Sequence, residues 1–165
     1  IALRANFYLL FKASLFTRLK TLLTNPYFLA FVGMVISSSV VSILKSKSIH
    51  GCPKDLLIYG GNLPFLNLFE QLPTGVKAGH CFPGGHASGG FALIGFYYAF
   101  RDSKPKFAWV MLVIGLIFGF AMGWAQMMRG EHFLSHNLWS AWVVWLVLFV
   151  LFTVKNNREK FKDDF

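Results

Sequence analysis

Apolar residues along the chain fall into four charge-free runs, separated by polar, basic or glycine-rich stretches. A helix needs about 20 mostly apolar residues to cross a membrane. The third run reaches that length, and the second is marginal. The pattern predicts an all-α, polytopic transmembrane helix bundle. We expect about four spans, namely Tyr27–Leu44, Gly85–Phe100, Phe107–Met128 and Leu138–Val154.

Glycines recur at every fourth position in the third run. Gly115, Gly119 and Gly123 therefore lie on one face of the predicted helix. Small residues on a helix face let a neighbouring helix approach closely inside a membrane. We expect the third span to pack tightly against another helix along this face.

Both flanks of the predicted bundle carry charges. Residues 1–26 mix apolar and basic positions, so we expect an interfacial amphipathic helix or a truncated span. Because the chain begins with Ile rather than Met, we expect the true N-terminus to lie upstream. Residues 155–165 should form a fraying cytoplasmic tail. We treat residues 1–165 as a single membrane domain with a helical core at 27–154.

The composition supports a membrane protein. The chain is 55% hydrophobic and only 14% charged, whereas a soluble domain is about a quarter charged. The net charge of +9 would favour nucleic-acid binding in a soluble protein. Here the basic residues lie mostly between apolar runs, where membrane topology explains them. We therefore predict membrane lipids as surroundings and no nucleic-acid partner.

Loop charges predict the orientation of the bundle. The basic turn at 101–106 and the C-terminal tail should be cytoplasmic. Four spans then bring the 45–82 loop and the 129–137 connection together at the opposite, non-cytoplasmic face. The loop also carries Cys52 and Cys81, for which a disulfide and two unpaired thiols are both open.

Two polar stretches at that face carry the candidate chemistry. In Pro83–Ser88, glycines precede His86 at a predicted helix start, which favours an anion; a plain loop-to-helix junction is the simpler alternative. In the second stretch, His132 and His136 are four residues apart and share a helix face, with Arg129 close by. These three suit an anionic group, or they are an interfacial arginine and helix caps.

A metal site is a further alternative. His132 and His136, with His86 as a third ligand, match the ligand types of zinc. No carboxylate cluster lies nearby to complete a hydrolytic zinc site. Haem ligation would need histidines inside the bundle, whereas these lie at its edge.

Three short motifs then occur in order. Lys45 is followed after six residues by Cys52-Pro53; Pro83-Gly84-Gly85-His86 comes next; His132 and His136 end the series. Together they resemble the type 2 phosphatidic acid phosphatase superfamily of integral-membrane lipid phosphatases. That family carries lysine, six residues, Arg-Pro; then Pro-Ser-Gly-His; then Ser-Arg, five residues, His, three residues, Asp.

The resemblance implies a role for each residue. His132 would attack phosphorus and form a phosphohistidine, His86 would protonate the leaving oxygen and later activate water, and His136 would orient His132. No metal or other cofactor is required. The implied phosphate-binding residues are Lys45, Arg129, Gly84, Gly85 and Ser88.

Four positions depart from the family pattern. Cys52 and Gln126 stand where the family has arginines, Gly84 replaces a serine, and His136 replaces the aspartate. Two guanidiniums and one carboxylate are therefore missing from their usual places. The chain is either a variant branch, similar to bacterial lipid A-type phosphatases, or impaired in activity.

We therefore predict a metal-independent membrane phosphatase that hydrolyses a phosphate from a lipid head group. Lipid A, undecaprenyl diphosphate and phospholipid phosphates are the candidate substrates. The expected location is a bacterial inner membrane, with the site on the periplasmic or extracellular face. The alternatives are a lipid phosphotransferase and a non-catalytic protein of the same fold that binds anionic lipid.

Overall fold

The computed structural model describes residues 21–22 and 24–163, and every regular element within them is a helix. The all-α prediction is therefore confirmed. The helix predicted within residues 1–26 lies mostly outside the described residues. The elements are α2 (Pro26–Lys47), η1 (Pro53–Asp55), η2 (Leu57–Tyr59), α3 (Gly85–Phe91), η3 (Ala92–Ile94), α4 (Gly95–Phe100), α5 (Pro105–Met128) and α6 (Leu134–Asp163).

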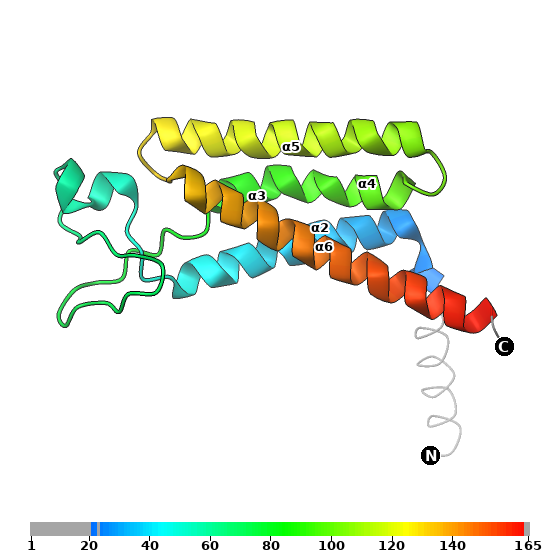
Figure 1. Ribbon diagram of the computed structural model, residues 1–165, viewed down its shortest axis with the longest axis horizontal. Helices are drawn as coiled ribbons and strands as arrows, with labels where there is room; N and C mark the ends of the chain where they lie inside the picture. The colour runs from blue at the N-terminus through cyan, green and yellow to red at the C-terminus, as the bar shows by residue number, and fades with distance from the viewer. Residues whose placement is uncertain (1–20, 23, 164–165) are drawn as a thin grey trace, which may run out of the picture.

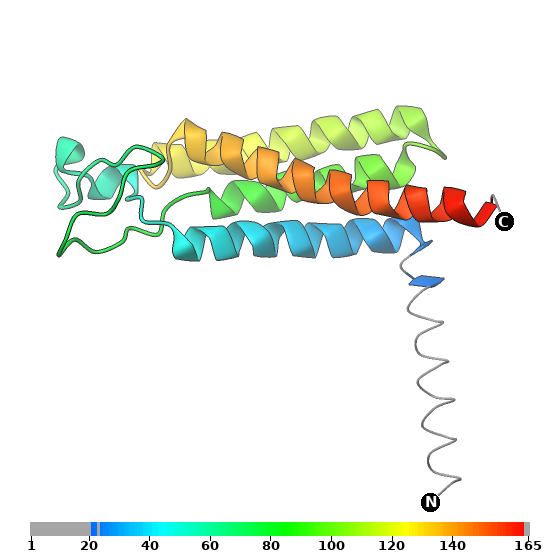
Figure 2. The same ribbon diagram turned by 60° about the horizontal axis from the view of Figure 1, so that its bottom comes forward.

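The helices form one elongated bundle, in which α3 and α4 lie in line along α5 (Figures 1 and 2). At one end, the long segment between α2 and α3 lies near the turn between α5 and α6. The other end holds the start of α2, the turn between α4 and α5, and the described end of α6. Both histidine-bearing stretches therefore lie at the same end of the bundle, as the loop charges predict.

The first long helix, α2, begins and ends at clear signals. The side-chain oxygen of Asn25 accepts hydrogen bonds from two backbone N–H groups of the first turn, and Pro26 occupies the first helical position. The helix ends at Lys47. Lys45 therefore lies in the last turn, at the end of the bundle that carries the histidines.

Three helices of the described part are long and apolar enough to cross a membrane: α2, α5 and the stretch of α6 up to Phe161. The second predicted span, Gly85–Phe100, is instead a rod of three short helical segments, α3, η3 and α4. Its middle segment is a tighter 3₁₀ turn, which breaks the regular α-helix. The rod still packs along α5 for its whole length.

The predicted glycine face on α5 is confirmed. Gly115, Gly119 and Gly123 are all buried, and the first two face η3 and α3. A Cβ atom added to Gly90 of α3 would lie 2.5 Å from the backbone nitrogen of Gly119. The two backbones therefore approach at a distance that only glycines permit.

Replacing Gly119 with alanine should destabilise the bundle. The added methyl group would collide with the ring of Phe91, which is fully buried. Overpacking of this kind costs about 1–3 kcal/mol. We expect a lower thermal unfolding midpoint for Gly119→Ala in detergent. Gly89→Ala is the matched control, because its new methyl group would meet no atom within 4 Å; equal midpoints for both variants would contradict the packing argument.

The last helix, α6, is longer at both ends than the predicted span. It begins at Leu134, so His136 lies in its first turn rather than in a connecting loop. It continues to Asp163, whereas the sequence analysis expected the chain to fray from Lys155. An ion pair of 2.7 Å between Lys155 and Glu159, one helical turn apart, supports this extension.

Candidate active site

The candidate site lies where three helices, α2, α3 and α6, meet the connection between α5 and α6 at the loop-bearing end of the bundle. The last turn of α2 supplies Lys45 and the first turn of α3 supplies His86. His132 precedes α6, and His136 lies in the first turn of that helix. His132 and His136 are buried, with 4% and 5% of their surfaces exposed, whereas His86 is exposed to solvent.

The two buried histidines contact each other directly. Their Nδ1 atoms lie 3.3 Å apart. One nitrogen of such a pair must carry the proton and the other must accept it. If His132 donates, His136 orients the imidazole, and Nε2 on the opposite edge of the ring keeps a free lone pair. This arrangement suits His132 for nucleophilic attack.

Charge and burial keep His132 neutral. Burial, together with the positive charges of Lys45 and His86, lowers the pKa of His132 to about 4. A protonated imidazole has no lone pair to donate at Nε2, so the neutral form is the nucleophilic one. His132 is therefore neutral at neutral pH.

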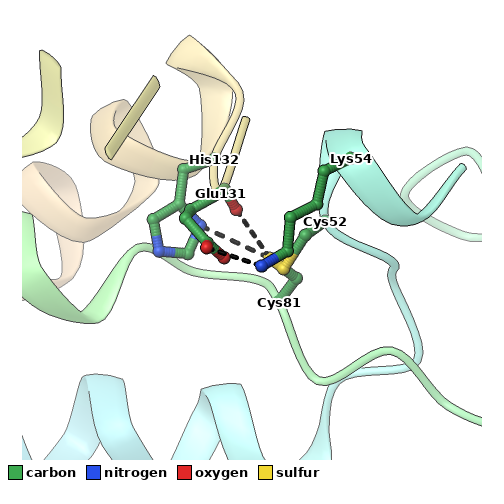
Figure 3. Close-up of polar contacts among 5 residues, drawn as sticks. All are labelled: Cys52, Lys54, Cys81, Glu131 and His132. Carbon is green, nitrogen blue, oxygen red and sulfur yellow. Dashed lines mark hydrogen bonds and ion pairs between the residues drawn. A yellow bond between two sulfur atoms is a disulfide. The ribbon is translucent and has the colours of Figure 1, made fainter. Parts of the chain in front are cut away.

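The two cysteines form a disulfide, which answers the question that the sequence left open. Cys81 Sγ lies 3.5 Å from Nδ1 of His132 and 2.9 Å from the carbonyl oxygen of Glu131 (Figure 3). A disulfide sulfur has no proton to donate, so these are close contacts rather than hydrogen bonds. Cys52, which stands at a family arginine position, is therefore part of a cross-link beside His132.

An ion pair connects the long segment between α2 and α3, called the outer loop here, to the segment that carries His132. Lys54 Nζ lies 2.6 Å from Glu131 Oε1 (Figure 3). This hydrogen bond lowers the pKa of Glu131 and raises that of Lys54. The backbone N–H of Lys54 also donates to the carbonyl of Gly130 at 3.0 Å. Gly130 has φ +68°, a conformation that favours glycine, so the turn here is tight.

Further hydrogen bonds join the start of α3 to the start of α6, next to His136. The hydroxyl of Ser140, fully buried, lies 2.8 Å from the carbonyl oxygen of Gly84 and 2.9 Å from that of His136. The N–H of Gly84 donates to the same carbonyl of His136 at 3.1 Å. A Cβ atom at position 84 would lie 2.7 Å from Oδ1 of buried Asn137. This packing gives a physical reason for glycine in place of the family serine.

The predicted phosphate-binding residues have different surroundings. Lys45 is half-buried, and its side chain passes 3.9 Å from the position of a Cβ at Gly85. Arg129 is exposed at the end of α5. The N–H of Gly84 already donates to His136, and the buried hydroxyl of Ser88 donates to the carbonyl of Gly85 at 2.7 Å. Of these two predicted cations, Lys45 contributes to the lowered pKa of His132 and Arg129 does not.

A cavity of about 280 Å³ lies beside His136, between the outer loop and the start of α6. Its walls are largely apolar and aromatic, with Phe65, Phe82, Phe133 and Trp139 among them. His50 adds a polar side chain to the lining. The site therefore combines the polar histidines with a largely apolar cavity beside them.

Sequence reasoning missed several contributors to this site. Cys81 contacts His132 across a separation of 51 residues, and Ser140 contacts Gly84 across 56. The ion pair between Lys54 and Glu131 spans 77 residues. The only sequence signal was the presence of two cysteines in one loop.

These features define a helical membrane protein with a buried histidine pair and a lysine at one end of its bundle. The family model of the PAP2 superfamily matches residues 26–160, and the chain belongs to this superfamily. The superfamily generally comprises phosphatases that act on lipid phosphates. No curated protein and no solved structure gives a significant match.

Proposed function

We propose that this protein is a lipid phosphatase that works through a phosphohistidine on His132. The observation that carries the proposal is the buried contact between His132 and His136, 3.3 Å apart at Nδ1. It fixes the ring of a neutral histidine whose other nitrogen is available for attack. The charge of Lys45, after burial, lowers the pKa of His132.

The first step transfers the phosphoryl group to the protein. The lone pair of His132 Nε2 attacks phosphorus, and the bond from phosphorus to the lipid oxygen breaks. His86, in the first turn of α3, protonates the departing oxygen. Positive charge grows on the ring of His132, and His136 receives the hydrogen bond from its Nδ1–H.

The second step releases phosphate. His86 has lost its proton to the leaving group and now accepts one from water, which attacks phosphorus. The bond from phosphorus to His132 Nε2 breaks, and the lone pair returns to that nitrogen. The balance is one lipid phosphate and one water consumed, and one dephosphorylated lipid and one phosphate formed. Lys45 stabilises the phosphoryl oxygens throughout, with Arg129 as a second source of positive charge.

A lipid substrate suits the position of the site. The histidines lie at the end of apolar helices, so a bilayer crossed by these helices would have its head groups near them. The cavity beside His136 offers apolar walls for the part of the lipid nearest the phosphate. A bacterial inner membrane with the site on the periplasmic face is the proposed location. The disulfide supports this face, because such bonds persist in oxidising compartments.

A phosphate-release assay tests the function directly. The full chain in detergent would be given lipid A, undecaprenyl diphosphate, phosphatidylglycerol phosphate and phosphatidic acid in turn, with and without EDTA. We expect release from at least one lipid, unchanged by EDTA. Loss of activity in EDTA would contradict metal independence. Lipid binding without release would favour the non-catalytic alternative, and transfer of the phosphate to an added lipid acceptor would favour a phosphotransferase.

A further inference from the structure

Three potential metal ligands converge behind the proposed nucleophile. The sulfur of Cys81 and one ring nitrogen each of His132 and His136 all lie within 4.8 Å of one another. All three residues are buried. The mechanism proposed above uses the two histidines but gives the sulfur no role.

The spacing of these atoms matches that of ligands around one zinc ion. Zinc–nitrogen bonds of 2.0–2.1 Å place two imidazole nitrogens about 3.3 Å apart in a tetrahedral site, and a thiolate sulfur about 3.6 Å from each nitrogen. In the structure, the two Nδ1 atoms are 3.3 Å apart, and Cys81 Sγ is 3.5 Å from Nδ1 of His132. Two of the ligand-to-ligand distances of a tetrahedral zinc site are therefore present before any ion binds.

The disulfide keeps Cys81 from acting as a ligand. A disulfide sulfur carries no negative charge, whereas a zinc ligand is a thiolate. Cutting the bond to Cys52 would free Cys81 at its present place beside His132. The rest of the site should keep its arrangement, because the Lys54–Glu131 ion pair and the hydrogen bonds of Ser140 do not depend on the disulfide.

We propose that reduction of the Cys52–Cys81 disulfide creates a zinc-binding site formed by Cys81, His132 and His136. A dithiol supplies two electrons and two protons, becomes a cyclic disulfide, and leaves two protein thiols. Zinc then displaces the thiol proton of Cys81, the Nδ1 proton of His132 moves to its Nε2, and the ion binds the sulfur together with the two Nδ1 atoms. A solvent molecule takes the fourth position.

The electrostatic surroundings partly favour a cation there. Lys45 and His86 oppose it when charged, but the thiolate supplies a negative charge, and the carboxylate of Glu131, although paired with Lys54, offsets part of their effect. The ligand set of two imidazoles and one thiolate is typical of zinc rather than of calcium or magnesium, which prefer oxygen ligands.

Zinc at this position should inhibit the reaction proposed above, and this consequence rests on the proposed function. The ion would replace the hydrogen bond between His132 and His136 and would withdraw electron density from the His132 ring. With zinc on Nδ1, Nε2 of His132 carries the ring proton and has no lone pair to attack phosphorus. The site therefore differs from a catalytic zinc site, since the ion lies on the nitrogen that faces away from the substrate.

A pair of cysteine variants tests the binding without any activity assay. Cys52→Ser and Cys81→Ser both lack the disulfide, but only Cys52→Ser keeps the thiol beside the histidines. Each full-length variant in detergent is titrated with Co²⁺ as a spectroscopic probe, followed by competition with Zn²⁺ against a chromophoric chelator. We expect Cys52→Ser to show the thiolate-to-cobalt charge-transfer band and tetrahedral visible bands. Its affinity for zinc should exceed that of Cys81→Ser by at least about 10-fold, because Cys81→Ser lacks a direct ligand.

The wild-type protein provides a second measurement that needs no variant to fold. It is compared as isolated and after dithiol treatment and desalting under argon, and only the reduced sample should show the cobalt bands. Equal metal binding by the two variants would overturn the proposal. So would the absence of cobalt bands from both Cys52→Ser and the reduced wild type. The failure of the phosphatase proposal would appear separately, as absence of phosphate release by the oxidised wild type without added metal.

Discussion

Replacing His132 with alanine should abolish phosphate release from the lipid that the wild type hydrolyses. Alanine cannot form the phosphorus–nitrogen bond, so the covalent route is lost altogether. Removal of a nucleophile in comparable covalent enzymes lowers kcat by about 10⁶-fold. We expect a fall of at least about 10³-fold, measured as phosphate released in detergent, with lipid binding retained.

A labelled-phosphate experiment and a histidine control sharpen this test. Wild-type protein quenched during turnover of a ³²P-labelled lipid should carry acid-labile label, and His132→Ala should carry none. His80→Asn is the control, because His80 is an exposed loop residue with φ +50°, a conformation that asparagine tolerates. Release by His132→Ala at the wild-type rate would rule out His132 as the nucleophile.

The bundle is largely predictable because its signals are local. Three charge-free runs became α2, α5 and most of α6, and the glycine spacing of α5 marked its packing face correctly. Loop charges placed the two histidine stretches at one end of the bundle. Each of these inferences depends on hydropathy or spacing within a single segment.

Two features of the helices were not predicted. The rod at Gly85–Phe100 is broken by η3, although its composition reads as one apolar run. The continuation of α6 past Lys155 runs through a charged stretch, in which Lys155 and Glu159 form an ion pair one helical turn apart. Neither feature follows from hydropathy alone.

In the candidate site, the local spacing of the histidines was informative, whereas the contacts between distant segments could not be predicted. The spacing of His132 and His136 suggested a shared helix face, but α6 begins between them, and the two rings still contact each other at Nδ1. The path of the outer loop brings Cys81 to His132, and no pattern within the loop predicts that path. Cys52 occupies a family arginine position, yet its role here became visible only as part of the disulfide.

The second large effect is expected at His136, the residue that replaces the family aspartate. His136→Ala removes the group that receives the hydrogen bond of His132 Nδ1, 3.3 Å away. Loss of the orienting member of a hydrolase triad lowers kcat by about 10⁴-fold. Because a neutral histidine stabilises the developing positive charge less than a carboxylate does, we expect a smaller fall here, of about 10²-fold.

His136→Asp separates this orienting role from simple packing. A carboxylate beside His132 stabilises its protonated form, so the pKa of His132 should rise from about 4 towards its ordinary value near 6.5. Phosphate release requires the neutral ring, so activity should fall as pH drops through that pKa. The acid limb of the pH profile should therefore move to higher pH in His136→Asp, while kcat at neutral pH stays well above that of His136→Ala. An acid limb at the same pH in the wild type and His136→Asp would mean that residue 136 does not act on His132.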